Sequence, residues 1–267
     1  STVEVIAQED AAVQVTLSSG AKERADLLVG ADGIHSRVRE LTFGAEHQFV
    51  RNLGYHTAAF VLNDTGMREQ IGSSFATLTL PGRQVALYPV REGRVATFWV
   101  HRSDEPISDP TAAAAARELR DSFGGLDWVV PRVLDHAAQA TTMYFDTVSQ
   151  VIMPRWSHAR VVLIGDACQC VSLLAGQGAS MAMGGAYVLA EELRKGDVAS
   201  ALGRYEKRIR PAILAKQKAG RAIARWFVPD GPVHLAVRDA VLRMSASPLG
   251  GWLLRRQIAG ESVIARS

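Results

Sequence analysis

Apolar and polar residues alternate along the beginning of the chain. Residues 2–8 (TVEVIAQ) and 12–18 (AVQVTLS) place apolar side chains at about every second position, which is the period of a strand with one buried face. A Ser-Ser-Gly turn sequence closes the second run. The pattern predicts two antiparallel strands that face a core on one side.

Two other runs are apolar without this alternation. Residues 25–33 (ADLLVGADG) and 159–166 (ARVVLIGD) both finish with glycine and aspartate. A short, continuous apolar run predicts a buried strand, and the glycine predicts a tight turn after it. After the first run, Ser36 is predicted to cap a short helix through Arg39 and Glu40.

Residues 46–101 are rich in β-branched and aromatic side chains and are divided by LPGR and REGR turns, so they predict a largely antiparallel sheet. A further strand is expected at 141–150. The remaining patterns favour helices over four stretches, which are 109–123, 127–138 with its start near Asp127, 178–194, and 199–219 with an interruption at Pro211.

The order of these elements predicts an interrupted α/β domain. Strands with one Gly-Asp turn come first, a β-rich region follows, and the second such turn precedes helices. We expect four segments: the first part of a ligand-binding domain at 1–45, an inserted β-rich domain at 46–150, the second part of the first domain at 151–215, and a C-terminal helical segment at 216–267.

Composition excludes several classes of protein. The 30 Lys and Arg barely exceed the 27 Asp and Glu, so nucleic-acid binding is not expected. No apolar run reaches about 20 residues, and neither a transmembrane helix nor a signal peptide is expected. Cys168 and Cys170 are the two cysteines; they exclude a disulfide framework, which fits a reducing cytoplasm. The seven histidines are dispersed without an HxxxH pair, and no metal site is predicted.

The second Gly-Asp turn carries candidate chemistry. An aspartate directly after a buried strand lies at the edge where open α/β sheets bind ligands, so Asp166 can accept hydrogen bonds from sugar or ribityl hydroxyls. Gly176-Gln177-Gly178 allows the backbone to approach a flat ligand, and the helix behind it offers N–H groups to an anionic atom. Alternatively, Asp166 only caps a helix and the glycines only form a turn. The residues by themselves leave both interpretations open.

Two motifs together resemble one family. DLLVGADGIHSRVR (26–39) resembles the Asp-Gly motif of the FAD-dependent aromatic hydroxylases, the group A flavoprotein monooxygenases, and VLIGDACQCVSLLAGQGASMAM (162–183) resembles their Gly-Asp motif. The resemblance covers roughly residues 1–220. It implies a p-hydroxybenzoate hydroxylase-like α/β fold: a GR2-type, Rossmann-like FAD-binding domain, incomplete at its N-terminus, with an inserted antiparallel β-rich substrate domain and C-terminal helices.

The resemblance also implies a cofactor site and a reaction. The family's FAD-contacting positions correspond here to Asp166 for the ribityl chain, flanked by Gly165 and Ala167, to Gly176, Gln177, Gly178 and Ala179 for the isoalloxazine, and to Asp32 and Gly33, supported by Ser36 and Arg39, for the pyrophosphate region and the use of NAD(P)H. The implied reaction is hydroxylation by O2 of an aromatic, quinol or polyketide-like small molecule through a flavin C4a-hydroperoxide. No side chain need act as nucleophile, so no catalytic residue is assigned.

Three departures from the family pattern stand out. Gln169 replaces the histidine after the Gly-Asp motif, and Leu173 replaces the proline before Gly-Gln-Gly. The GxGxxG loop that grips the ADP half of FAD does not occur in this sequence. We expect Ser1 not to be the natural start, and this chain alone not to hold FAD tightly.

Other interpretations remain open. A flavin-dependent dehydrogenase or reductase on the same fold, or a truncated fragment that acts only as a binding module, fits the same motifs. Tyr55, Tyr88, Trp99 and Tyr144 are candidate substrate contacts in the insertion, or ordinary core residues. His35 is either a phosphate contact or an exposed loop residue, and Cys168 and Cys170 are more easily read as incidental than as redox-active. The amphipathic segment HLAVRDAVLRM is expected to pack on the domain rather than on a membrane.

Overall fold

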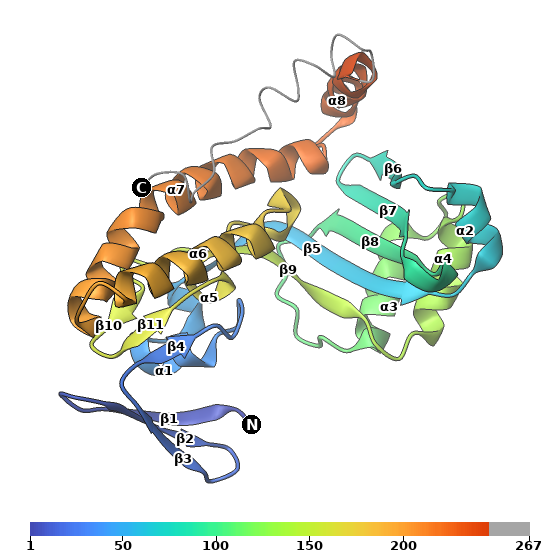
Figure 1. Cartoon of the computed structure of the whole chain (residues 1–267). Coiled ribbons are helices and arrows are strands. Elements are labelled where there is room, and N and C mark those ends of the chain that lie inside the picture. Colours follow the sequence, from blue (N-terminus) through green and yellow to red (C-terminus); the bar gives the residue numbers. More distant parts are fainter. Residues whose placement is uncertain (246–267) are drawn as a thin grey trace. The chain divides into compact units, whose positions relative to one another are not determined.

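The structure, a computed structural model, describes residues 1–245 (Figure 1). This part of the chain forms two compact units. Unit 1 consists of residues 1–51 and 149–223, and unit 2 consists of residues 52–148 with the segment that begins at residue 224. Each unit has its own hydrophobic core.

Unit 1 contains two small sheets. The first joins β1 (Val3–Gln8), β2 (Val13–Leu17) and β3 (Lys22–Ala25) in antiparallel order, which confirms the strands predicted from the alternation. The second has the order β10 (Ser157–His158), β11 (Val161–Leu163), β4 (Leu28–Gly30). In it, β4 and β11 run parallel, with Leu28 opposite Val161.

The two continuous apolar runs behave differently. All three residues of β11 have no exposed surface. The strand predicted from 25–33 shrinks to β4, and Val29 is 39% exposed. Burial on both faces is therefore wrong for β4, because this strand lies at the edge of its sheet in the described part of the chain.

Four helices complete unit 1: α1 (Arg37–Phe43), α5 (Asp166–Gln169), α6 (Gly178–Leu193) and most of α7 (Val198–Phe227). Ser36 caps α1 as predicted, since its side chain accepts a hydrogen bond from the Arg39 backbone N–H. Short 3₁₀ helices lie at Glu46–Gln48 and Leu173–Ala175.

α7 corrects the predicted interruption at Pro211. The helix is continuous over 30 residues with Pro211 inside it, so the boundary expected at residue 216 also falls within a helix. A proline removes one backbone donor and crowds the preceding turn. Ile209 and Ile213, which flank it, are both 1% exposed in the core of unit 1, and their burial offsets that cost. Within residues 1–245, neither α7 nor any other helix is long and apolar enough to span a membrane.

Unit 2 is built on a five-stranded sheet. Its order is β6 (Ala76–Leu80), β7 (Arg83–Pro89), β8 (Val95–Arg102), β5 (Val50–Leu62) and β9 (Tyr144–Val151), and the pairs β6–β7, β7–β8 and β8–β5 are antiparallel. This agrees with the largely antiparallel sheet predicted for residues 46–101. α3 (Ala112–Phe123) and α4 (Val130–Gln139) cover one face, where their apolar side chains share a core with the sheet (Figure 1).

Two helix starts in unit 2 differ from expectation. α4 begins at Val130 rather than near Asp127, and its cap residue, Val129, makes no side-chain capping bond. α2 (Thr65–Ile71) was missed altogether. Its signal was present in Asp64, whose side chain accepts a hydrogen bond from the Met67 backbone N–H, but the surrounding β-rich composition outweighed it.

The segment after α7 packs on unit 2. α8 (Pro232–Ser245) includes Arg238, which is 8% exposed and donates from Nη2 to Oε1 of Gln84 on β7 at 3.1 Å. The rings of Phe98 and Phe227 also meet edge to face, with centroids 5.9 Å apart. The expected packing of HLAVRDAVLRM on the domain is thereby confirmed, while the later WLLRRQI lies outside the described residues.

Candidate functional site

The parallel pairing of β4 and β11 brings the two motifs to one edge of a sheet. Gly30 and Leu163 are partners in the register and are the last residues of their strands. The Asp-Gly turn and the Gly-Asp turn therefore follow at the same, carboxyl edge, where ligands of α/β sheets bind. Only the long-range pairing of two short strands places them together.

Asp32 fixes the first turn. Its Oδ1 accepts a hydrogen bond from Ser36 Oγ at 2.5 Å, and its Oδ2 accepts one from the Val38 backbone N–H at 3.0 Å. Gly33 follows with a φ of 81°, a left-handed conformation that glycine adopts without strain. The carboxylate of Asp32 thus shapes the entry to α1, although its residue surface remains exposed.

Arg39 joins the two motifs from inside the protein. Its side chain has no exposed surface. The guanidinium donates to the carbonyl of Ile34 at 2.7 Å and to that of Ala167 at 3.0 Å, and it pairs with Glu46 at 3.1 Å. Burial lowers the pKa of Arg39, while Glu46 and Asp32 act in the opposite direction. These contacts let Arg39 hold the two loops together, and its assignment to the cofactor site stays a prediction.

Asp166 lies on the second turn and has a free carboxylate. It is the first residue of α5, after Gly165 with φ 58° and ψ −145°. The residue is exposed, and yet burial by its surroundings raises the pKa of its carboxyl above the usual value. Burial is the one cause of that shift; no neighbouring charge or donor among the described residues contributes. The carboxylate is available to accept hydrogen bonds from a ligand.

The start of α6 lies beside this carboxylate. A Cβ built on Gly178 would stand 3.6 Å from Oδ1 of Asp166, so glycine keeps the space between them open. Gly176 is left-handed, with φ 64°, and Gln177 precedes the helix without a capping side-chain bond. Gly176, Gln177 and Ala179 are exposed. A carboxylate acceptor and the N–H groups of a 16-residue helix therefore border one accessible surface.

The two positions that depart from the family pattern, Gln169 and Leu173, differ in their exposure. Gln169 is 2% exposed and donates from Nε2 to the Tyr205 hydroxyl at 2.5 Å. Cys168 is 1% exposed, and burial raises the pKa of its thiol well above the usual value, which disfavours the reactive thiolate. Leu173, by contrast, is 45% exposed. His35 lies against Glu46, with Nδ1 3.0 Å from Oε1.

The four aromatic candidates of unit 2 separate into two groups. Trp99 has no exposed surface and packs edge to face on Phe123 of α3, so it belongs to the core and the predicted substrate contact is corrected. Tyr55 is 2% exposed beneath the guanidinium of Arg102. Tyr144 is 48% exposed.

Tyr88 is the candidate with a partner suited to a flat ligand. Its ring stacks on Phe75, with centroids 5.5 Å apart and an interplanar angle of 24°. Phe75 is 58% exposed, so its ring is accessible to a ligand. The pair presents an aromatic surface on unit 2 that the sequence pattern indicated only through Tyr88.

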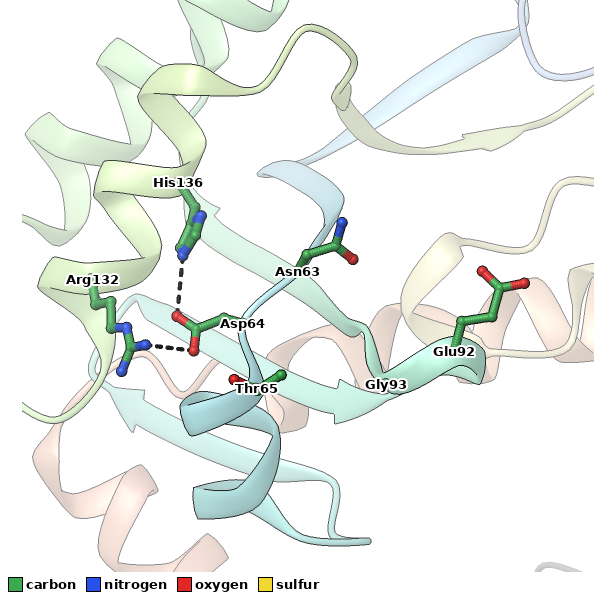
Figure 2. Close-up of a pocket in the computed structure, with 7 residues that line it drawn as sticks. All are labelled: Asn63, Asp64, Thr65, Glu92, Gly93, Arg132 and His136. Carbon is green, nitrogen blue, oxygen red and sulfur yellow. Dashed lines mark hydrogen bonds and ion pairs between the residues drawn. The ribbon is translucent and has the colours of Figure 1, made fainter.

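A polar pocket of about 700 Å³ in unit 2 holds none of the predicted site residues (Figure 2). Its most buried member, Asp64, accepts hydrogen bonds from Arg132 Nη2 at 2.6 Å and pairs with His136 Nε2 at 3.1 Å. These contacts and the cap of α2 lower the pKa of Asp64 against the effect of its burial. Both carboxylate oxygens of Asp64 are already hydrogen-bonded. The polar residues of this pocket therefore join α2 to α4.

The parallel strands, the Asp-Gly and Gly-Asp turns (the two acid turns) and the glycine-opened helix are the features of a mixed α/β domain with a candidate ligand site at one sheet edge. A family described as FAD binding domain matches residues 2–213, and the chain belongs to this family. A flavin-dependent monooxygenase from an unknown prokaryotic organism is 32% identical over 243 residues, which is 88% of this chain and 61% of that relative.

Two solved structures show the same fold. The tetracycline destructase Tet(55) superposes with a TM-score of 0.78 at 29% identity, over 90% of this chain and 64% of that one. HpxO of Klebsiella pneumoniae, in a complex with FAD and uric acid, superposes with a TM-score of 0.66 at 26% identity, over 83% and 58% of the two chains. The resemblance to the flavin-dependent monooxygenases is confirmed. The chain spans about half to three-fifths of the length of curated relatives that it matches, 52% and 61% in two cases.

Proposed function

We propose that this chain is the flavin- and substrate-binding part of an FAD-dependent monooxygenase that uses NAD(P)H and O2. The observation that carries the proposal is the free carboxylate of Asp166 beside the open start of α6. A ribityl chain offers several hydroxyl donors to such a carboxylate. When bound, the flavin supplies the activation of oxygen.

The residues of the site bind and position the flavin. Asp166 accepts the ribityl hydroxyls, and the backbone at Gly176, Gln177 and Gly178 lies against the ring, with Gly165, Ala167 and Ala179 beside them. The start of α6 directs N–H groups and the positive end of its dipole towards the anionic edge of a reduced flavin. Asp32, Gly33 and Arg39 hold the turn that borders the pyrophosphate.

The proposed substrate is a flat, electron-rich ring, such as a phenol, quinol, heteroaromatic or polyketide ring. Support comes from the exposed Phe75 stacked on Tyr88, because aromatic faces bind planar rings by offset stacking. The HpxO relative was solved with uric acid, itself a planar heteroaromatic molecule. Tyr144 remains a secondary candidate, and Trp99 and Tyr55 are excluded by their burial.

The flavin proposal is tested by titration of the 267-residue chain with riboflavin and with FAD, followed by flavin fluorescence. The sequence contains no GxGxxG loop to grip the ADP half. We therefore expect both ligands to bind with dissociation constants within about threefold of each other, a difference below roughly 0.7 kcal/mol. Asp166→Ala should weaken both at least about tenfold.

Asp26→Asn provides the matched control, because Asp26 is an exposed carboxylate of the same unit. Equal binding by the Asp166 variant and the control would contradict the proposed site. A much stronger affinity for FAD than for riboflavin would place the main contacts outside the residues named above. With a reductant and a phenolic substrate, oxygenated product supports a monooxygenase, whereas peroxide alone supports the alternative flavin oxidoreductase.

A further inference from the structure

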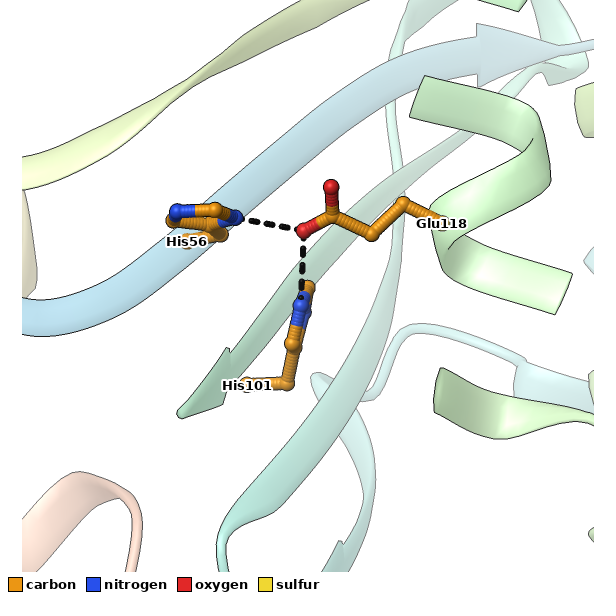
Figure 3. Close-up of side chains that lie close together, drawn as sticks. All are labelled: His56, His101 and Glu118. Carbon is orange, nitrogen blue, oxygen red and sulfur yellow. Dashed lines mark hydrogen bonds and ion pairs between the residues drawn. The ribbon is translucent and has the colours of Figure 1, made fainter. Parts of the chain in front are cut away.

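Three side chains of unit 2 direct their polar atoms to one point under α3 (Figure 3). His56 on β5 is the register partner of His101 on β8, and cross-strand partners project from the same face of a sheet. Glu118 on α3 reaches both. Its Oε1 lies 2.5 Å from Nδ1 of His56 and 2.9 Å from Nε2 of His101, and the three ligand atoms lie within 4.8 Å of one another.

The second ring nitrogen of His56 fixes its tautomer. Nε2 lies 2.7 Å from the backbone carbonyl oxygen of Glu105. A carbonyl oxygen only accepts, so Nε2 carries the hydrogen. In the neutral ring, Nδ1 then presents a lone pair to the Glu118 carboxylate at 2.5 Å. Two acceptors at that distance repel each other unless a cation lies between them. The pair therefore shares either a proton, carried by Nδ1 or by Glu118, or a metal ion that replaces the proton once the two atoms move to about 3.3 Å apart.

Several features favour a metal ion over a proton. A histidine that binds a metal through one nitrogen commonly donates its other N–H to a carbonyl or carboxylate, as His56 does to Glu105. The His101 side chain is 9% exposed, and its Nε2 faces the same Glu118 oxygen as Nδ1 of His56. Glu118 is 31% exposed, which gives an ion and a water a route to the cluster.

We propose that His56 Nδ1, His101 Nε2 and the Glu118 carboxylate form a zinc site that ties α3 to the sheet. Two histidines, one carboxylate and a water are a ligand set that zinc accepts, with bonds of about 2.0–2.2 Å. Tetrahedral ligands at such distances lie about 3.3 Å apart. Glu118 therefore withdraws slightly from His56 when the ion enters, which its partly exposed side chain permits. The site is independent of the flavin proposal, because none of its residues takes part in that one.

The test begins with the 267-residue chain, stripped by a chelator and dialysed at pH 7.5 against about 10 µM free Zn²⁺. We expect one zinc per chain by elemental analysis and a rise of several degrees in the unfolding temperature. Cobalt in place of zinc should give the visible absorption of a four-coordinate site, which ions held loosely on the surface do not give. An unfolding temperature that zinc does not change would mean that a proton alone bridges His56 and Glu118, and would overturn the proposal.

Variants locate the site. His101→Gln and Glu118→Gln each remove one ligand and should weaken zinc binding at least about 10- to 100-fold. His158→Gln removes an exposed histidine of unit 1 and should bind zinc as the parent does. Near-ultraviolet circular dichroism confirms that each variant is folded. Folded ligand variants that retain zinc with the parent's affinity would contradict the assignment.

Discussion

Nη1 of Arg39 donates a hydrogen bond of 3.0 Å to the carbonyl of Ala167, and this bond joins two turns that lie 128 residues apart in the chain. The same guanidinium donates to the backbone carbonyl of Ile34 and to the carboxylate of Glu46. Both acid turns of the proposed flavin site therefore depend on one fully buried side chain. Arg39 acts on a ligand through the positions of these turns.

Arg39→Lys should separate the two turns. A lysine keeps the charge but cannot supply the planar set of donors that reaches several acceptors, and a buried cation with lost partners costs about 2–4 kcal/mol of unfolding free energy. Urea unfolding measures this loss, and riboflavin titration measures the accompanying loss of affinity. Arg37→Lys, at an exposed ion pair with Glu40, should change both by little. Unchanged stability in Arg39→Lys would show that the bond to Ala167 is dispensable.

Gly165→Ala should destabilise the turn before Asp166. Gly165 has φ 58° and ψ −145°, a conformation that costs a residue with a side chain about 1–3 kcal/mol, and a Cβ there would approach Cβ of Ala182 at 3.2 Å. Gly184→Ala, inside α6, is the control, since a Cβ there meets no described atom within 4 Å. It should be neutral or stabilise by up to about 1 kcal/mol. Thermal unfolding that ranks the two alanines the other way would refute this account of the turn.

Asp166→Asn should make the folded chain more stable and weaken its binding of flavin. A carboxyl whose folded-state pKa is raised binds its proton more tightly when folded, so the folded state becomes less favourable as pH rises through that pKa. At pH 7 the charge opposes folding, and the neutral amide should raise the unfolding temperature by about 1–2 °C, a small effect because the residue is exposed. The gain should vanish near pH 3, where the parent is itself protonated. A variant less stable than the parent at pH 7 would contradict this sign.

Glu192→Gln should have the opposite pH dependence. Glu192 is 3% exposed and pairs with Lys195, Arg204 and Arg208, whose hydrogen bonds lower its pKa to about 2 despite its burial. Its stabilisation is present above the unfolded-state pKa near 4.5 and is lost as pH falls towards 2. We expect a loss of about 2–4 kcal/mol at pH 7, shrinking between pH 4.5 and 2.5 in denaturant titrations. A loss independent of pH would mean that packing, rather than charge, is what Glu192 contributes.

The two cysteines should be unreactive in the folded protein. Cys168 and Cys170 are 1% and 7% exposed, neither forms a disulfide within the described residues, and burial raises the pKa of Cys168. Labelling by a maleimide should be at least about 100-fold slower than in denaturant. Rapid labelling of the native chain would restore the interpretation of a redox-active pair.

The local elements were largely readable from the sequence. Alternation identified β1 and β2, the cap signal of Ser36 identified α1, and high alanine content identified α3, because each depends on neighbours within a few residues. The features that the sequence predicted wrongly depend on tertiary packing. α7 continues through Pro211 because buried isoleucines on both sides outweigh the lost backbone bond. The sequence makes Trp99 a candidate substrate contact, but the pairing of the strands places it on the face covered by α3.

The two acid turns, the glycines that open α6 and, through them, the flavoprotein family could be identified without coordinates. Those features are local motifs, and their residue types and spacing carry the chemistry. The folded chain was needed to show that Arg39 is a buried link between the two turns, and that His56 and His101 stand side by side beneath Glu118. Strand pairing and helix packing join residues that are 17 to 128 positions apart, and no short pattern in the chain specifies such partners.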